Sequence, residues 1–125
     1  MTGDVFFHGG IPGLAVGDVI APPDVTGTSH RLSAHAPDHA PHGTRTDVVY
    51  VTTVQNIARF YAACYPDGAL YRVEPEGIVG PDPDAPTCSM MCASALIVAV
   101  IRPRVVFAHR RFEEWLRLLD RSTVA

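Results

Sequence analysis

The chain lacks any long hydrophobic run. No segment approaches the roughly 20 apolar residues that cross a bilayer, and the N-terminus has no basic stretch followed by an apolar core and a small-residue cleavage site. Charged residues are also few, at 18%, and the formal net charge is -3, so the sequence has no basic surplus of the kind that attracts nucleic acids or membrane surfaces. These absences predict a cytoplasmic protein with no membrane partner and no nucleic-acid partner recognised through charge.

Cysteine is scarce, and its number is odd. We expect Cys64, Cys88 and Cys92 to be reduced thiols, because a chain of this size can build a core without disulfides. The spacing of Cys88 and Cys92 is compatible with half of a zinc site, but no second Cys/His pair follows it, so we interpret both as core residues.

Four histidines gather in a proline-rich segment without forming a common metal-ligand pattern. They are His30, His35, His39 and His42. We interpret them as part of a solvated loop, and the sequence predicts no metal cofactor.

Several catalytic signatures are also missing. The chain has no Gly-x-Ser-x-Gly, no phosphate-binding loop and no Gly-x-Gly-x-x-Gly after a strand. These gaps argue against the common serine hydrolases, nucleoside-triphosphatases and dinucleotide-binding folds.

The residues that are present predict one α+β domain spanning 1–125. At 125 residues, 47% of them hydrophobic, the chain can form a single core. Hydrophobic periodicity predicts strands at 4–8, 18–20, 47–53, 69–74, 96–101 and 105–107, helices at 54–65 and 112–119, and loops at 22–46 and 76–86. Because this order does not alternate strand and helix regularly, we expect a mostly antiparallel sheet.

His8 follows an apolar, aromatic run and precedes two glycines. Glycine lets a ligand approach the main chain closely, so this strand end is a candidate binding site, although a histidine can also be satisfied by the backbone alone. Tyr50 lies within a predicted strand, where tyrosine most often fills a core or a cross-strand pair.

Taken in order, a set of motifs resembles the rifamycin-inactivating ADP-ribosyltransferases. They are FHGG at 7–10, LAVGDVI at 14–20, VYVTT at 49–53, VEPEG at 73–77, DP at 82–83 and a stretch at 89–99 that begins with serine. The match covers about residues 5 to 105. Several ordered motifs at compatible spacing are more specific than any one of them.

The resemblance implies the compact ADP-ribosyltransferase fold, with two small, mostly antiparallel sheets around an NAD cleft and flanking helices. It implies transfer of ADP-ribose from NAD to a hydroxyl of a rifamycin-type antibiotic, with release of nicotinamide. The implied catalytic residues are His8, Tyr50 and Asp82, with Asp84 and Glu74 as alternatives for the acid. The implied NAD contacts are His8, Gly9, Gly10, Tyr50, Thr52 and Tyr61.

The chain departs from the family pattern in three places. Gly10 replaces a threonine, the stretch 89–95 lacks the family's aromatic, arginine and glutamate residues, and the segment between Asp82 and Ser89 is short. We expect the loop at 22–42 and the pair Met90-Met91 to shape the acceptor side. Two alternatives stay open: a toxin-like transferase acting on a protein or nucleic acid, and an inactive NAD-binding or interaction domain.

Overall fold

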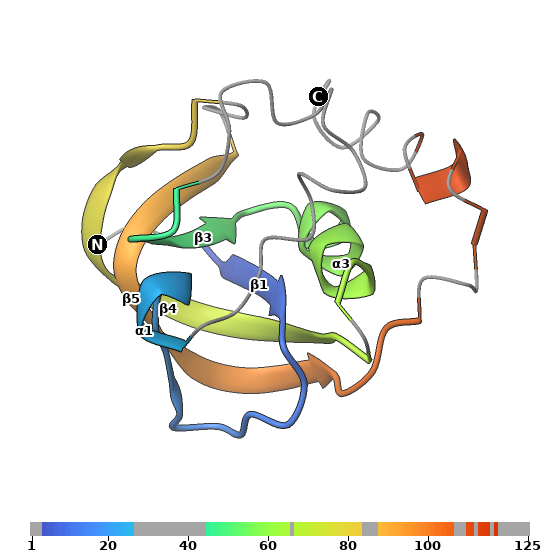
Figure 1. Ribbon diagram of the computed structural model, residues 1–125, viewed down its shortest axis with the longest axis horizontal. Coiled ribbons are helices and arrows are strands. Elements are labelled where there is room, and N and C mark those ends of the chain that lie inside the picture. Colours follow the sequence, from blue (N-terminus) through green and yellow to red (C-terminus); the bar gives the residue numbers. More distant parts are fainter. Residues whose placement is uncertain are drawn as a thin grey trace.

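The protein is a mixed α+β structure with one antiparallel sheet and few helices (Figure 1). The computed structural model describes residues 4–26, 45–65, 67–83, 88–106, 110–111, 113–115 and 117. Its elements are β1 (Phe6–Gly10), β2 (Val19–Ile20), α1 (Pro23–Thr26), β3 (Val49–Thr52), α3 (Gln55–Ala63), β4 (Ala69–Pro81) and β5 (Ser89–Arg102). The α+β class and the antiparallel sheet predicted from the sequence are confirmed.

The strands form one continuous sheet rather than the two small sheets implied by the resemblance. Their order is β2-β5-β3-β1-β4, and β4 also pairs with β5, so the pairings β1–β3, β3–β5, β5–β4 and β4–β1 complete a circuit. The long hairpin of β4 and β5 bends around the shorter strands (Figure 1). Three irregularities in its ladder accompany this bend, as β-bulges do in strongly curved strands.

Both strands of this hairpin extend beyond the predicted boundaries. The sequence predicts a strand ending before Pro75 and a loop after it, but β4 continues through Pro75 to Pro81. Proline is tolerated here because β4 pairs with β1 only as far as Val73, so beyond that residue one of its edges is open. β5 likewise begins at Ser89, well before the apolar run that predicted it.

Helix α3 lies against β1 and joins a hydrophobic cluster that includes Phe60 and Trp115 (Figure 1). Val54 is the N-cap residue of α3, and its side chain makes no capping hydrogen bond. The Thr52 hydroxyl accepts the Val54 N–H, at 3.1 Å.

A second cluster, centred on Tyr71 and Cys92, fills the opposite face of the sheet. The two clusters therefore pack against opposite sides of the same strands.

Towards the C-terminus, Val105 and Val106 form no strand, contrary to the prediction for 105–107. The predicted terminal helix is seen in part, since the described residues 113–115 and 117 are helical. Trp115 is buried there, with its ring centroid 6.0 Å from that of Phe60. Within the described ranges, no helix is long and apolar enough to cross a membrane.

Candidate functional site

His8 binds the main chain of Tyr50, which lies 42 residues further along the sequence. Its Nδ1 is 2.8 Å from the Tyr50 carbonyl oxygen. Because a carbonyl only accepts hydrogen bonds, Nδ1 carries the proton, and Nε2 of the neutral ring is an acceptor. Burial lowers the pKa of His8, and the bond to the Tyr50 carbonyl opposes this shift. The ring is therefore neutral near pH 7, and its Nε2 is unprotonated.

This contact occurs where β1 and β3 separate. In the part of the chain that the structure describes, these two strands share a single ladder pair, Phe7 with Thr52. Side chains alternate between the faces of a sheet, so Tyr50 and Thr52 lie on the same face as Phe7, and His8 lies on the other. The structure thus brings His8 to the main chain of Tyr50 rather than to its phenol ring.

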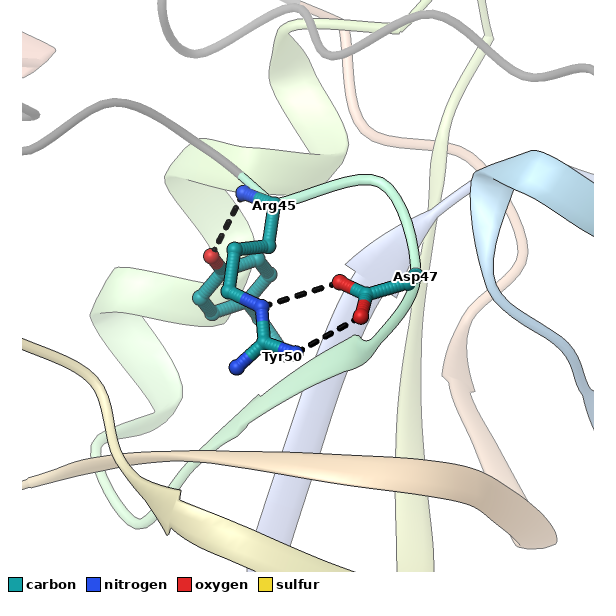
Figure 2. Close-up of polar contacts among 3 residues, drawn as sticks. All are labelled: Arg45, Asp47 and Tyr50. Atoms are coloured by element: carbon teal, nitrogen blue, oxygen red, sulfur yellow. Dashed lines mark hydrogen bonds and ion pairs between the residues drawn. The ribbon is translucent and has the colours of Figure 1, made fainter.

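The Tyr50 hydroxyl is occupied by the segment that precedes β3. It accepts the main-chain N–H of Arg45 at 2.9 Å, and the Arg45 guanidinium binds both carboxylate oxygens of Asp47 (Figure 2). Hydrogen bonding from Arg45 lowers the pKa of the Asp47 carboxyl. Both charged side chains are about half exposed, so the ion pair adds little stability. The main-chain bond from Arg45 ties the segment before β3 to the Tyr50 side chain.

The two glycines after His8 have different structural roles. A Cβ on Gly9 would lie 1.8 Å from the Ala58 carbonyl oxygen and 2.5 Å from the Ala62 nitrogen, so α3 covers this residue directly. A Cβ on Gly10 would lie 2.7 Å from Nε2 of His8. The imidazole therefore lies against Gly10, and a larger residue at position 10 would require this ring to shift.

Thr52 and Tyr61 lie on the α3 side of the sheet. Thr52 is fully buried, and its hydroxyl donates to the Cys88 carbonyl at 3.0 Å, so its proton is used within the protein. Tyr61 lies on α3 and is partly buried against the cluster around Phe60.

Asp82 directly follows β4 and is buried, with 6% of its surface exposed. Its main-chain N–H donates to the Ser89 carbonyl at 3.0 Å, and Ser89 pairs with Thr52 in the next strand. The competing acid Glu74 is exposed on β4, and Asp84 lies outside the described residues. Of the two candidate acids that the structure describes, Asp82 is buried and Glu74 is exposed.

Three residues form a cross-strand row that the sequence analysis did not identify as one site. Asp82, Ser89 and Thr52 are the buried polar or charged side chains of the described chain, and ladder pairing places them side by side. In the sequence, Ser89 stands out only as the start of the stretch at 89–99. That signal is weak, because a serine just before an apolar strand usually marks the end of a loop.

The described residues contain no group of three histidine, cysteine or acidic side chains close enough to hold a metal ion. The four loop histidines lie outside the described residues. Cys64, Cys88 and Cys92 are free thiols. Burial raises the pKa of Cys92 to about 11, and its Sγ donates to the Val49 carbonyl at 3.4 Å.

These environments predict which thiol reacts first with iodoacetamide. Cys88 is partly exposed, whereas Cys64 and Cys92 are buried, and the thiolate is the reactive species. Peptide mass spectrometry of the native protein should find the label on Cys88, with the other two thiols reacting only after denaturation. Early labelling of Cys92 would contradict the buried position of β5.

The lowered pKa of His8 predicts a dependence of stability on pH. An unfolded histidine titrates near about 6.5, so between that value and the lower pKa of the folded state the unfolded chain binds more protons. The free energy of unfolding should therefore be unaffected by His8 at neutral pH and should fall as the pH drops below about 6.5.

Urea unfolding of wild type and of His8→Asn across this range would measure the His8 contribution as the difference between the two slopes. Equal slopes would show that the folded protein does not depress this pKa.

Comparison with known proteins supplies no relative: no protein-family model matches the chain, and no curated protein matches it. Functional inference therefore depends on the geometry above and on the motif resemblance.

Proposed function

We propose that the protein is an NAD-dependent mono-ADP-ribosyltransferase. The observation that carries the proposal is the bond between His8 Nδ1 and the Tyr50 carbonyl. It joins two of the motifs that carry the family resemblance, and it fixes the orientation of an imidazole whose Nε2 is unprotonated. If His8 had only a structural role, the bond to the Tyr50 carbonyl would explain the position of Nδ1. It would not explain why Gly10 lies beside Nε2.

The reaction breaks the bond between nicotinamide and the ribose C1′. Nicotinamide leaves with the bonding electron pair, and an oxocarbenium-like transition state develops on the ribose. The oxygen of the acceptor hydroxyl then bonds to C1′ and loses its proton. No metal is required, since the leaving group is already a cationic pyridinium.

The proposal gives each site residue a role. His8 Nε2 accepts a hydrogen bond from a ribose hydroxyl, Tyr50 packs against the nicotinamide ring, and Asp82 stabilises the cation or takes the acceptor proton. The further NAD contacts are Gly9, Gly10, Thr52 and Tyr61. The free thiols are in line with a cytoplasmic location.

For the acceptor, we propose a hydroxyl of a rifamycin-type antibiotic. The methionine pair expected to shape this side is largely committed to packing: Met91 is buried, and Met90 lies against the cluster around Tyr71. Most of the loop at 22–42, which is also expected on this side, lies outside the described residues.

The test is mass spectrometry of rifampicin incubated with NAD and the protein, with nicotinamide release followed in the same sample. Drug that gains one ADP-ribose with wild type, and not with His8→Asn, supports the full proposal. Nicotinamide release with unmodified drug retains the transferase class and directs the search to protein or nucleic-acid acceptors. NAD binding without release points to an inactive binding domain, and the absence of binding overturns the proposal.

A further inference from the structure

Helix α3 and the end of β5 each bring an arginine to the rim of the hydrophobic cluster around Phe60. Arg59 lies on α3 directly before Phe60, which is fully buried in that cluster. Arg102 is the last residue of β5 and pairs with Leu70 of β4. Residues opposite each other in a ladder share a face, and Leu70 belongs to the same cluster. Both arginines therefore lie on the α3 side of the sheet.

A third arginine reaches this cluster through Trp115. The Arg110 guanidinium lies over the Trp115 ring, 4.8 Å from its centroid, and that ring packs against Phe60. Burial lowers the pKa of Arg59, and repulsion by the charges of Arg110 and Arg102 lowers it further. Arg59 is thus within electrostatic reach of both other guanidiniums.

No carboxylate neutralises these three charges in the part of the chain that the structure describes. No acidic group contributes to the pKa shift of Arg59. The ion pairs found there involve other arginines, namely Arg45 with Asp47, Arg104 with Asp67, and Arg111 with Glu114. Arg59 and Arg110 are also partly buried, and water and salt screen such charges less than fully exposed ones. Their repulsion lowers the stability of the fold unless an anion binds between them.

The guanidinium groups define the chemistry of that anion. Each is a planar fork of N–H donors with a permanent charge, a shape that matches pairs of carboxylate or phosphate oxygens. A carboxylate carries one charge and two oxygens, whereas a phosphate group carries up to two charges and three strong acceptor oxygens. Three neighbouring cations without a counter-charge therefore fit a phosphate better than a carboxylate.

We propose that Arg59, Arg102 and Arg110 form a binding site for a phosphate-bearing small molecule. The site goes beyond the proposed function, because it lies on the α3 side of the sheet, whereas His8 lies on the opposite face. The Trp115 ring holds the Arg110 guanidinium in place, so less side-chain freedom is lost when the ligand binds. Inorganic pyrophosphate and the diphosphate of a nucleotide present the same groups to these arginines.

The test is thermal unfolding of the full chain at increasing concentrations of inorganic pyrophosphate, with the ionic strength kept constant by sodium chloride. Arg59→Gln and Arg110→Gln each remove one charge from the site. Arg72→Gln is the matched control, because Arg72 is exposed on β4 and its charge is not among those that shift the pKa of Arg59. All three variants change the net charge equally. Parallel series use ADP-ribose, as the nucleotide diphosphate, and malonate, as a dicarboxylate.

Without pyrophosphate, Arg59→Gln should melt at the wild-type temperature or slightly above it, because a repulsion is removed. Pyrophosphate should stabilise wild type in a concentration-dependent way that gives its Kd. We expect that Kd to rise about tenfold in Arg59→Gln and in Arg110→Gln, and to change less than about twofold in Arg72→Gln. Stabilisation by ADP-ribose that is lost in the same two variants identifies a nucleotide as the source of the phosphates, and stabilisation by pyrophosphate alone identifies a free diphosphate.

Three results would overturn this inference. Neither pyrophosphate nor ADP-ribose might stabilise wild type beyond sodium chloride, or their effect might be equal in Arg59→Gln and Arg72→Gln, as expected of a general salt effect. Equal stabilisation by malonate would show that the site does not select phosphate. None of these outcomes depends on nicotinamide release, and His8→Asn should keep the wild-type response to pyrophosphate, so failure of this inference and failure of the proposed function are distinguishable.

Discussion

Replacing Gly9 with alanine is expected to destabilise the protein by more than about 3 kcal/mol. The added Cβ would overlap the Ala58 carbonyl oxygen and the Ala62 nitrogen. Both are backbone atoms of α3, so no side-chain rotation relieves the clash and the helix must move off β1. Since domains of this kind are stable by only about 5–15 kcal/mol, the variant should unfold at much lower urea concentration.

Gly80→Ala is the matched control for this experiment. No heavy atom lies within 4 Å of a Cβ built at Gly80, so the same added methyl should change the urea midpoint only slightly. A Gly9→Ala protein with a wild-type midpoint would show that α3 does not lie directly on β1. Circular dichroism of both variants separates a displaced helix from global unfolding.

Replacing His8 with asparagine is expected to reduce nicotinamide release about 100-fold or more while leaving the protein folded. The asparagine amide can place an N–H near the position of Nδ1 and retain the bond to the Tyr50 carbonyl. It provides nothing at the position of Nε2, which the proposed reaction uses to hold the ribose. The variant therefore removes the ligand contact and keeps the structural one.

His8→Ala separates the two functions of this residue. It loses both nitrogens and with them the bond to the Tyr50 carbonyl where β1 and β3 separate, so it should lower the melting temperature as well as the rate. Nicotinamide release and thermal unfolding, measured for both variants, test whether Nε2 supports activity and Nδ1 supports stability. Activity that survives in His8→Asn would show that Nδ1, and hence the backbone contact, is all that the histidine contributes.

The secondary structure was predicted well where the local pattern was strong. The β-branched run before Thr52 and the amphipathic segment after it predicted β3 and α3 within a few residues. The hairpin of β4 and β5 was underestimated, because Pro75 and the polar residues beyond it are typical of loops. They remain in a strand because β5 pairs with them along one edge while the other edge is open.

The candidate site was likewise predicted only in part from the sequence. The motifs alone singled out His8, Tyr50 and Asp82, since residue types and their order are written in the chain. They did not show that His8 meets the backbone of Tyr50 rather than its ring, that Gly10 makes room for the imidazole, or that Ser89 is buried beside Asp82. Each of these depends on which strands become neighbours.

The sequence by itself determined the α+β class, the positions of the main strands and helix α3, and the residue types available for chemistry, because hydrophobic periodicity and local backbone preferences act over a few residues. Only the tertiary structure decided that the strands close into one sheet and that Thr52, Ser89 and Asp82 form a row. The pairings of Phe7 with Thr52 and of Thr52 with Ser89 join residues far apart in the sequence, and their register is selected by the packing of both faces of the sheet at once.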